Sequence, residues 1–200
     1  MALLHKATLH PSKLDLLTGY LRQSSLTQLG AYRFDDPEGQ VGIETHLVRD
    51  DSGAVWHLPL TYRSAPLPGI EEWAVGTMDH SVLGKRWVYN ACADPVYAGE
   101  LIRAILSGGS QVEQFFETDE GPEVRESTAT VVGSGTADTP VPQVSGVHAE
   151  SFDADTVIDV GSVQVVVRHR LDTPEPENPS ATLVGTWAAT DRQIVLAYVP

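Results

Sequence analysis

The segment VGIETHLVRDDSGAVWHLPLTYR, residues 41–63, constrains the fold of this chain more than any other. Residues alternate in polarity along both of its halves, which is typical of two β-strands that each bury one face. Asp51 and Ser52 separate the halves, and a tight turn there predicts a hairpin that pairs Leu47 with Trp56. A one-residue slip would expose the apolar set. The other predicted pairs are Thr45 with Leu58, Ile43 with Leu60 and Val41 with Tyr62.

The same register places His46 and His57 opposite each other on the polar face, with Glu44 next along it. A cross-strand histidine pair is able to bind zinc, but zinc usually takes three or four ligands. No other spaced cysteine and histidine cluster occurs in the sequence. Two solvated histidines are therefore the favoured interpretation, and a metal site is the alternative.

A second antiparallel pair is predicted over residues 73–81 and 84–91, and a helix follows it. Asp94 is a good N-cap, Pro95 suits the first helical position, and Gly108 ends the helix. Its apolar residues recur at helical spacing, so one face should pack against a sheet. A shorter helix is predicted to begin after Ser12, where leucines recur at the same spacing.

The composition changes in the second half of the chain, where Val, Thr, Ser and Gly become frequent. We predict an α+β domain over residues 1–111 and a β-rich subdomain over residues 112–200. The remaining predicted strands are residues 2–9, 29–39, 125–135, 157–171, 181–190 and 193–199.

The chain has 200 residues and a net charge of −14, so its field repels phosphate backbones and anionic membrane surfaces. Nucleic acid and membranes are therefore not expected as partners. The N-terminus lacks the apolar stretch of a secretion signal, and no apolar run approaches the roughly 18 residues of a membrane span. A single cysteine, Cys92, excludes an intramolecular disulfide. These features favour a cytoplasmic protein.

Residues 77–97 contain side-chain types that occur in catalytic sites. On an extended strand, however, Asp79 and Ser81 point to one side and His80 to the other, so they cannot form a triad alone. Cys92 precedes a helix N-terminus, which would lower the pKa of an exposed thiol. The favoured interpretation is a small buried residue at a strand-to-helix corner.

A phosphate-binding loop has only a partial match in the sequence. Gly133 and Gly135 supply two glycines of G-x-G-x-x-G, but Asp138 stands where the third would be. A hairpin turn is the favoured interpretation of these two glycines. The Walker motif G-x-x-x-x-G-K-[ST] is absent.

The order of these segments resembles the N-terminal cap domain of bacterial maltokinases and related aminosugar kinases. The resemblance rests on the hairpin that ends in Leu58–Leu60 and on residues 88–106, VYNACADPVYAGELIRAIL. The family has a D-A-x-x-D-P helix start, which Asn90, Ala91, Asp94 and Pro95 match with asparagine in place of the first aspartate. The resemblance implies a cystatin-like fold, in which a curved antiparallel sheet wraps around a helix.

For residues 112–200 the resemblance implies a subdomain like the upper lobe of the kinases, which holds ATP phosphates. The family places an ATP-contacting lysine on a strand that corresponds to Val163–Val167, but Val165, Val166 and Val167 stand there. The catalytic lobe, with its base and metal ligands, has no counterpart before Pro200. Phosphoryl transfer needs those parts, so neither catalysis nor a cofactor is expected.

The leading hypothesis is a non-catalytic cap-like protein that binds or regulates a partner in maltose, trehalose or α-glucan metabolism. The alternative is a component of a sugar phosphotransferase or α-glucan-processing enzyme whose catalytic lobe lies in another chain. In that case nucleotide should bind at Gly133–Gly135 or beside Arg168 and Arg170. A third hypothesis is a sugar-binding module with a tryptophan-lined pocket. Pairing of exposed edge strands would give a homodimer. The candidate ligand- or partner-binding residues are Glu44, His46, Trp56, His57, Trp73, Lys85, Arg86 and Trp87.

Overall fold

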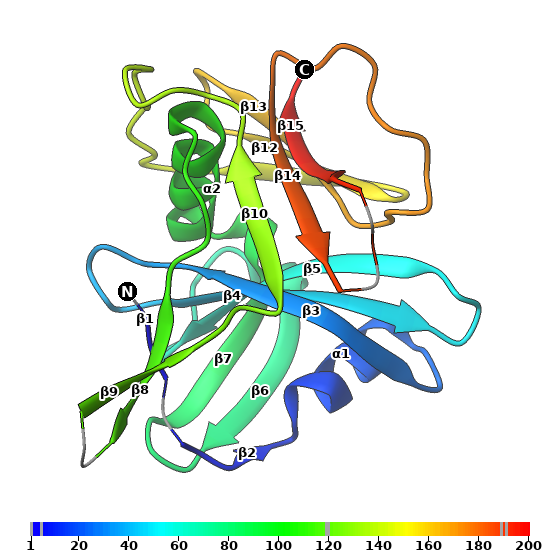
Figure 1. Cartoon of the computed structure of the whole chain (residues 1–200). Helices are drawn as coiled ribbons and strands as arrows, with labels where there is room; N and C mark the ends of the chain where they lie inside the picture. The colour runs from blue at the N-terminus through cyan, green and yellow to red at the C-terminus, as the bar shows by residue number, and fades with distance from the viewer. Residues whose placement is uncertain (1, 5, 119–120, 189, 191) are drawn as a thin grey trace.

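The structure is a computed structural model of the whole chain, and it describes residues 2–4, 6–118, 121–188, 190 and 192–200. Two six-stranded sheets, one small three-stranded sheet and two α-helices make up the described part (Figure 1). Most strand pairs are antiparallel, and the pair of β1 with β8 is parallel. The α+β class predicted from the sequence is therefore confirmed in its coarse form, as mostly antiparallel sheets with two helices. None of the described helices is long and apolar enough to cross a membrane.

The N-terminal sheet has the strand order β2-β6-β7-β5-β4-β3 and is strongly curved (Figure 1). Its strands β6 and β7 run across the direction of β3 and β4 in this view. The bounds are β2 (Leu9–His10), β3 (Leu26–Phe34), β4 (Gly42–Asp50), β5 (Val55–Arg63), β6 (Ala74–His80) and β7 (Gly84–Asn90).

The C-terminal sheet has the order β10-β14-β15-β13-β12-β11 and lies above the N-terminal sheet in Figure 1. The small sheet, β1-β8-β9, stands beside the N-terminal sheet and joins the start of the chain to its middle. The remaining bounds are β1 (Ala2–Leu4), β8 (Gln114–Thr118), β9 (Gly121–Arg125), β10 (Ala129–Gly133), β11 (His148–Phe152), β12 (Asp155–Asp159), β13 (Gln164–Arg168), β14 (Ala181–Trp187) and β15 (Ile194–Val199).

Both α-helices begin where the sequence predicts, and α2 also ends there. Helix α1 (Lys13–Leu21) starts with a capping box between Ser12 and Asp15. Helix α2 (Pro95–Ser107) starts at the Asp94 N-cap and ends at Gly108, which has a φ of 70°. Two short 3₁₀ helices, η1 (Glu71–Trp73) and η2 (Ala91–Ala93), lead into β6 and α2.

Two hydrophobic clusters cover the two faces of the N-terminal sheet. The smaller one lies under α1 and combines Leu17 with Leu60, Met78 and Val88 of the sheet. The larger one lies on the opposite face and joins that sheet to α2 and to the C-terminal sheet. The central strands of the N-terminal sheet are therefore buried on both faces.

The hairpin of β4 and β5 exists, but its predicted register is wrong by one residue. Leu47 pairs with His57, His46 with Leu58 and Val48 with Trp56. Since both faces are covered, alternation no longer selects one register. The turn selects it instead, because the Asp50 carboxylate accepts hydrogen bonds from the Ser52 and Ala54 amides.

Three further strand predictions differ from the structure. Residues 157–171 form parts of two strands, β12 and β13, joined by a turn at Gly161 rather than one long strand. Residues 2–9 contribute to two separate strands, β1 and β2, in different sheets. The strand predicted at 29–39 begins earlier, at Leu26, and ends at Phe34.

Candidate functional site

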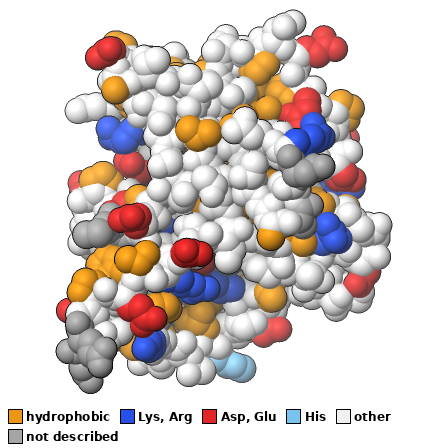
Figure 2. Space-filling view, in the orientation of Figure 1, with side chains coloured by type: hydrophobic (Ala, Val, Ile, Leu, Met, Phe, Trp, Pro, Cys, Tyr) orange, Lys and Arg blue, Asp and Glu red, His pale blue; other side chains and the backbone are white. Residues whose placement is uncertain are grey.

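A cleft of about 770 Å³ lies between the small sheet and the face of the N-terminal sheet that α1 covers. Figure 2 shows basic and apolar side chains gathered in this region, below the middle of the molecule. The lining combines residues from α1, both sheets and the β3–β4 loop. They are Lys6, Ala7, Leu9, Lys13, Arg33, Phe34, Asp35, Asp36, Gly39, Gln40, Val41, Gly42, Ile43, Tyr62, Ser64, Met78, His80, Leu83, Arg86, Phe116 and Arg125.

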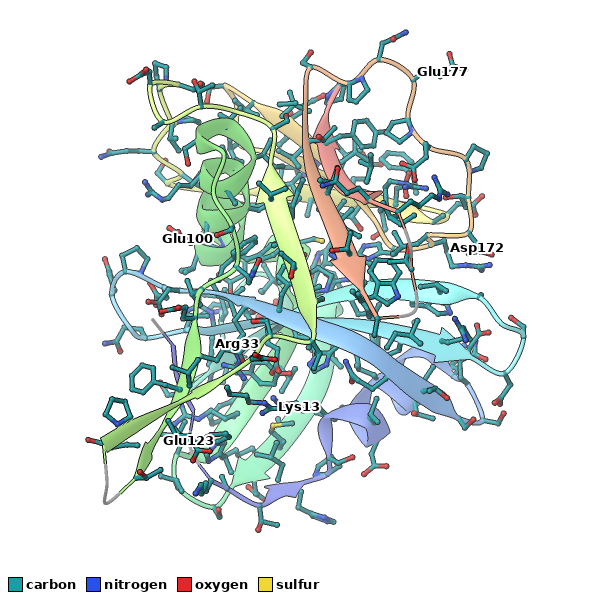
Figure 3. All side chains as sticks on the ribbon, viewed as in Figure 1. Lys13, Arg33, Glu100, Glu123, Asp172 and Glu177 are labelled. Carbon is teal, nitrogen blue, oxygen red and sulfur yellow. The ribbon has the colours of Figure 1, made fainter. Side chains whose placement is uncertain are left out.

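An ion-pair network forms the floor of this cleft. The Glu44 carboxylate accepts hydrogen bonds from the Lys13 ammonium and, at 2.8 Å, from Nη2 of Arg33. Figure 3 shows Lys13 and Arg33 reaching the same region from α1 and β3. Glu44 is buried, and Arg33, His46 and Lys13 together hold the pKa of its carboxyl well below the usual range against the opposing effect of burial.

His46 and Tyr62 extend this network under α1. Nε2 of His46 lies 3.2 Å from the Tyr62 hydroxyl and 3.7 Å from Glu44 Oε2. Burial lowers the pKa of His46 to about 4, although Glu44 acts in the opposite direction, so the ring is neutral at pH 7. We call Lys13, Arg33, Glu44, His46 and Tyr62 the outer cluster.

His57 lies on the other face of the sheet, in a separate set of polar groups. Its ring accepts a hydrogen bond from the Tyr32 hydroxyl at 2.8 Å and donates one to the Arg168 carbonyl at 2.8 Å. The His57 amide also donates to the His169 carbonyl at 2.9 Å. Burial lowers the pKa of His57 to about 3. We call Tyr32, His57, Arg168 and His169 the inner cluster.

The predicted pairing of His46 with His57 on one solvated face is therefore wrong. In the observed register the two side chains point to opposite faces, and both are buried. Glu44 lies on the His46 side and is neutralised by two cations. Among the described residues, no three His, Cys, Asp or Glu side chains are grouped so that they could hold a metal ion.

The three candidate tryptophans lie apart rather than around one pocket. The Trp56 indole donates to Asp50 at 2.8 Å, and its ring stacks with the Arg170 guanidinium. Trp73 packs against the larger core cluster, and Trp87 lies under Lys85. None of them lines the cleft.

The charged candidates Lys85 and Arg86 are neighbours on β7 but have different positions. Lys85 is exposed and contacts the Trp87 ring, with 5.2 Å between Nζ and the ring centre. Arg86 lines the cleft and donates to the Leu83 carbonyl. Of the eight candidate residues, Arg86 is the one that lines the cleft, while Glu44 and His46 lie beneath it.

The residues of the helix start that resembles a kinase cap have structural contacts. Asn90 accepts a hydrogen bond from the Cys92 amide, and Asp94 caps α2 while forming two hydrogen bonds of 2.7 Å with Arg63. Cys92 is fully buried, and burial raises the pKa of its thiol. The prediction of a small buried residue at the strand-to-helix corner is confirmed.

The glycines at 133 and 135 do not form a hairpin turn, which corrects the sequence-based interpretation. They pass the C-terminal end of α2, where the amides of Gly133 and Gly135 donate to the carbonyls of Gly109 and Ile105. A Cβ on Gly133 would collide with the Ala104 carbonyl oxygen. These amides therefore already have acceptors, and the negative end of a helix dipole faces them.

Four cations of the cleft escaped the sequence analysis: Lys6, Lys13, Arg33 and Arg125. They come from widely separated segments, so no local motif joins them. The sequence offers one signal for them, the small number of basic residues. The chain has 13 lysines and arginines against 27 acidic residues, so a group of cations in one place is notable. Their convergence is a property of the tertiary structure.

The chain is similar in sequence to a known domain family and in structure to a solved kinase. Residues 19–94 match the model of the maltokinase N-terminal cap domain. A glucosamine kinase, solved in complex with glucosamine, ADP and inorganic phosphate, is similar at 16% sequence identity and a TM-score of 0.48. The similarity covers 94% of this chain and 40% of the kinase chain. No curated protein matches the chain. The resemblance to the maltokinase N-terminal cap domain that the sequence indicates is thus confirmed over residues 19–94.

Proposed function

We propose that this chain is a non-catalytic binding or regulatory module of a sugar-kinase system, linked to maltose, trehalose or α-glucan metabolism. The single observation that carries the proposal is the match of residues 19–94 to the maltokinase N-terminal cap domain. The chain spans 40% of the length of the glucosamine kinase to which it is similar.

In this proposal, residues 1–111 act as a cystatin-like cap and residues 112–200 correspond to the kinase upper lobe. The curved N-terminal sheet and the α2 helix packed against it are consistent with the first part. The two segments share the larger hydrophobic cluster, which includes Ile43 and Ile102 from the first and Val131, Ile158 and Leu196 from the second. We therefore expect them to act as one body on a partner.

Contacts of the second segment support a non-catalytic role. The Gly133 and Gly135 amides already donate to the carbonyls of Gly109 and Ile105, which leaves them unable to hold a phosphate. Arg168 is 2% exposed and donates to the Thr173, Pro174 and Val195 carbonyls. An ATP phosphate would have to displace buried hydrogen bonds at either place, at a cost of about 1–3 kcal/mol for each polar group left unpaired.

The alternative is that the chain contributes to phosphoryl transfer together with a catalytic lobe, as a component of a sugar phosphotransferase. Arg170 is the residue that could contact a nucleotide in this alternative, because its guanidinium is partly exposed and pairs at the surface with Asp172. Under this alternative the chain would bind nucleotide beside Arg170. The sugar-binding hypothesis requires a rearrangement, since Trp56, Trp73 and Trp87 lie apart.

Two measurements on the purified chain distinguish these functions. Titration calorimetry with Mg-ATP should give no binding heat, and maltose or glucosamine with ATP should give no sugar phosphate. Turnover at ordinary enzyme rates, on the order of 1 s⁻¹ or faster, would refute the non-catalytic role. Heat from Mg-ATP that disappears in an Arg170→Gln variant would favour the phosphotransferase alternative.

Mixing the purified chain with a candidate partner enzyme tests whether the two bind. We expect the chain to bind a maltokinase or glucan enzyme from the same cell and to change its activity, with a surface that includes Lys85 and Trp87. A Lys85→Glu variant should weaken the complex, and the exposed Arg49→Glu on β4 is the matched control. The edge strand β2 offers a second contact mode, a homodimer by sheet pairing, which sedimentation velocity would detect.

A further inference from the structure

The cleft has the opposite charge to the protein around it. Five cations line it, Lys6, Lys13, Arg33, Arg86 and Arg125, in a chain whose net charge is −14. The carboxylates at or beneath the cleft are Asp35, Asp36 and Glu44. Counted without His80, these described groups leave an excess of two positive charges in one hollow. Such a concentration of like charge costs free energy unless an anion compensates it.

Asp36 and Glu44 are engaged in the fold. Asp36 accepts hydrogen bonds from the amides of Glu38, Gln40 and Val41 at 2.8–3.0 Å, which closes the β3–β4 loop. Glu44 is shared by Lys13 and Arg33. Neither is free to neutralise the other cations of the cleft.

Three of the cations form no ion pair with the described carboxylates. In the described part of the chain, no ion pair involves Lys6, Arg86 or Arg125. Lys6 and Arg125 each lie 5.9 Å from the centre of the Phe116 ring, and Nε of both Arg33 and Arg86 is buried without an acceptor. Side chains of Lys6, Arg86 and Arg125 line the cleft, and a cation there is the kind of group that an anionic ligand would pair with.

The electrostatic environment of Lys13 is consistent with this convergence. The pKa of Lys13 is lowered, first by burial and also by the charges of Arg33 and Arg125, while Glu44 acts in the opposite direction. Arg33 belongs to β3 and Arg125 to β9, so positive charges from two sheets act on one amine of α1. A bound anion would relieve this repulsion.

The size and lining of the cleft indicate more than a simple inorganic anion. A volume of about 770 Å³ lies in the range of small-molecule sites, far above what one phosphate fills. The Phe116 and Tyr62 rings and the Met78 side chain supply apolar contact beside the cations. An excess of two charges matches a phosphate monoester, which carries between −1.5 and −2 at pH 7.

We propose that this cleft binds a small phosphorylated organic molecule, with its phosphate held by Lys6, Arg33, Arg86 and Arg125 and its organic part against Phe116 and Tyr62. Arg33 and Arg86 border the site from the N-terminal sheet, and Arg125 and Lys6 close it from the small sheet and its approach. The inference rests on the cleft alone and does not depend on a role in a sugar-kinase system.

Titration calorimetry of the intact chain at low ionic strength tests the proposal with four probes: glucose 6-phosphate, inorganic phosphate, malonate and glucose. We expect glucose 6-phosphate to bind more tightly than phosphate, malonate to bind more weakly than either, and glucose not to bind. Raising the salt to 0.5 M should weaken binding at least fivefold, since exposed charges contribute. The amide NMR signals of residues 39–43 and 116 should shift on titration.

The matched variants remove two positive charges inside or outside the cleft. Lys6→Gln with Arg125→Gln should weaken glucose 6-phosphate binding at least tenfold, and both side chains are exposed, so the fold should be kept. Lys85→Gln with Arg49→Gln, both outside the cleft, should change binding less than twofold. Equal losses in the two double variants, malonate binding as tight as glucose 6-phosphate, or no binding of any probe at 5 mM would each overturn the proposal.

Discussion

The outer and inner clusters lie back to back on the same hairpin, and they use their polar groups in different ways. The outer cluster is charged, is centred on Glu44 and borders an open cleft. The inner cluster joins the two large sheets through hydrogen bonds of neutral groups to carbonyls, and its one guanidinium, Arg168, is buried. Since successive residues of a strand face opposite sides, one hairpin supplies a structural joint and a candidate ligand site at once.

Burial makes the loss of a hydrogen-bond partner more costly to stability in the inner cluster than in the outer cluster. In the inner cluster every mutation that removes a partner should act on stability, because the remaining groups have no access to water. In the outer cluster, Lys13 and Arg33 keep 27% and 17% of their side-chain exposure, so water softens the loss. The predictions below test this contrast, beginning with the largest expected effect.

Replacing the buried Arg168 side chain should have the largest effect on stability. Arg168→Leu removes donors to three carbonyls and to Glu175, and we expect the free energy of unfolding to fall by about 3–5 kcal/mol. Urea unfolding followed by fluorescence measures this loss. Arg170→Leu is the matched control two residues away, and its surface pair with Asp172 should contribute about 1 kcal/mol or less. Similar losses in both variants would contradict the contrast.

Neutralising Glu44 should affect both stability and the cleft. Glu44→Gln leaves Lys13 and Arg33 without their shared carboxylate, and we expect a stability loss of about 2–3 kcal/mol, below the full cost of a broken buried ion pair. The positive charge of the cleft also increases, so glucose 6-phosphate should bind more tightly. Urea unfolding and calorimetry check the two effects. Glu123→Gln on the exposed strand β9 is the control and should leave stability unchanged.

The pH dependence of stability should report both histidines. Their pKa values in the folded protein, about 4 for His46 and about 3 for His57, lie below the 6.5 expected for the unfolded chain. The unfolded chain therefore binds more protons below pH 6.5, and the free energy of unfolding decreases as the pH falls from about 6.5 toward 4.

For each histidine we expect a loss of about 2 kcal/mol at pH 5 relative to pH 7, since one pH unit corresponds to about 1.4 kcal/mol. His57→Gln and His46→Gln should each flatten the curve between pH 6.5 and 5, as measured by urea unfolding at several pH values. His148→Gln, at an exposed position, should not change the slope. A curve with the same slope in all three variants would show that neither histidine is held neutral by burial.

The smallest expected effect concerns the residue that sets the hairpin register. Asp50→Ala removes hydrogen bonds to the Ser52 and Ala54 amides and to the Trp56 indole, and we expect a loss of about 1–2 kcal/mol. Thermal unfolding measures it. Asp51→Ala is the control, because the Asp51 carboxylate contacts only Ser24 and Ser25 at the surface. A larger effect from Asp51 would place control of the register elsewhere.

Part of the fold could be predicted from the sequence because the deciding interactions are local. The N-caps at Ser12 and Asp94 and the stop at Gly108 depend on residues within one helical turn. The two hairpins of the N-terminal sheet follow from alternation and short turns. Segment order and the helix start at residues 90–95 were enough to identify the cap family, which the match over residues 19–94 confirms.

The candidate site could be predicted only in part, and the register is the reason. Glu44, His46 and Arg86 could be named from the sequence. The predicted register, however, placed His46 beside His57, because that register supposes a sheet with one hydrated face. Helix α1 covers that face, which removes the advantage of the expected register and lets the Asp50 turn decide. The hairpin turn predicted at Gly133 and Gly135 was wrong for a related reason. These glycines contact the end of α2, which is distant in sequence.

Neighbouring residues or composition are enough to give the helices, the hairpins, the similarity of residues 19–94 to the maltokinase cap domain and the acidic character of the chain. The tertiary structure alone decided which faces are buried, how His46 and His57 are separated and where the scarce cations meet. Lys6, Arg33 and Arg125 converge because the small sheet folds back beside the N-terminal sheet. Long-range strand pairing fixes such contacts, and no local pattern encodes them.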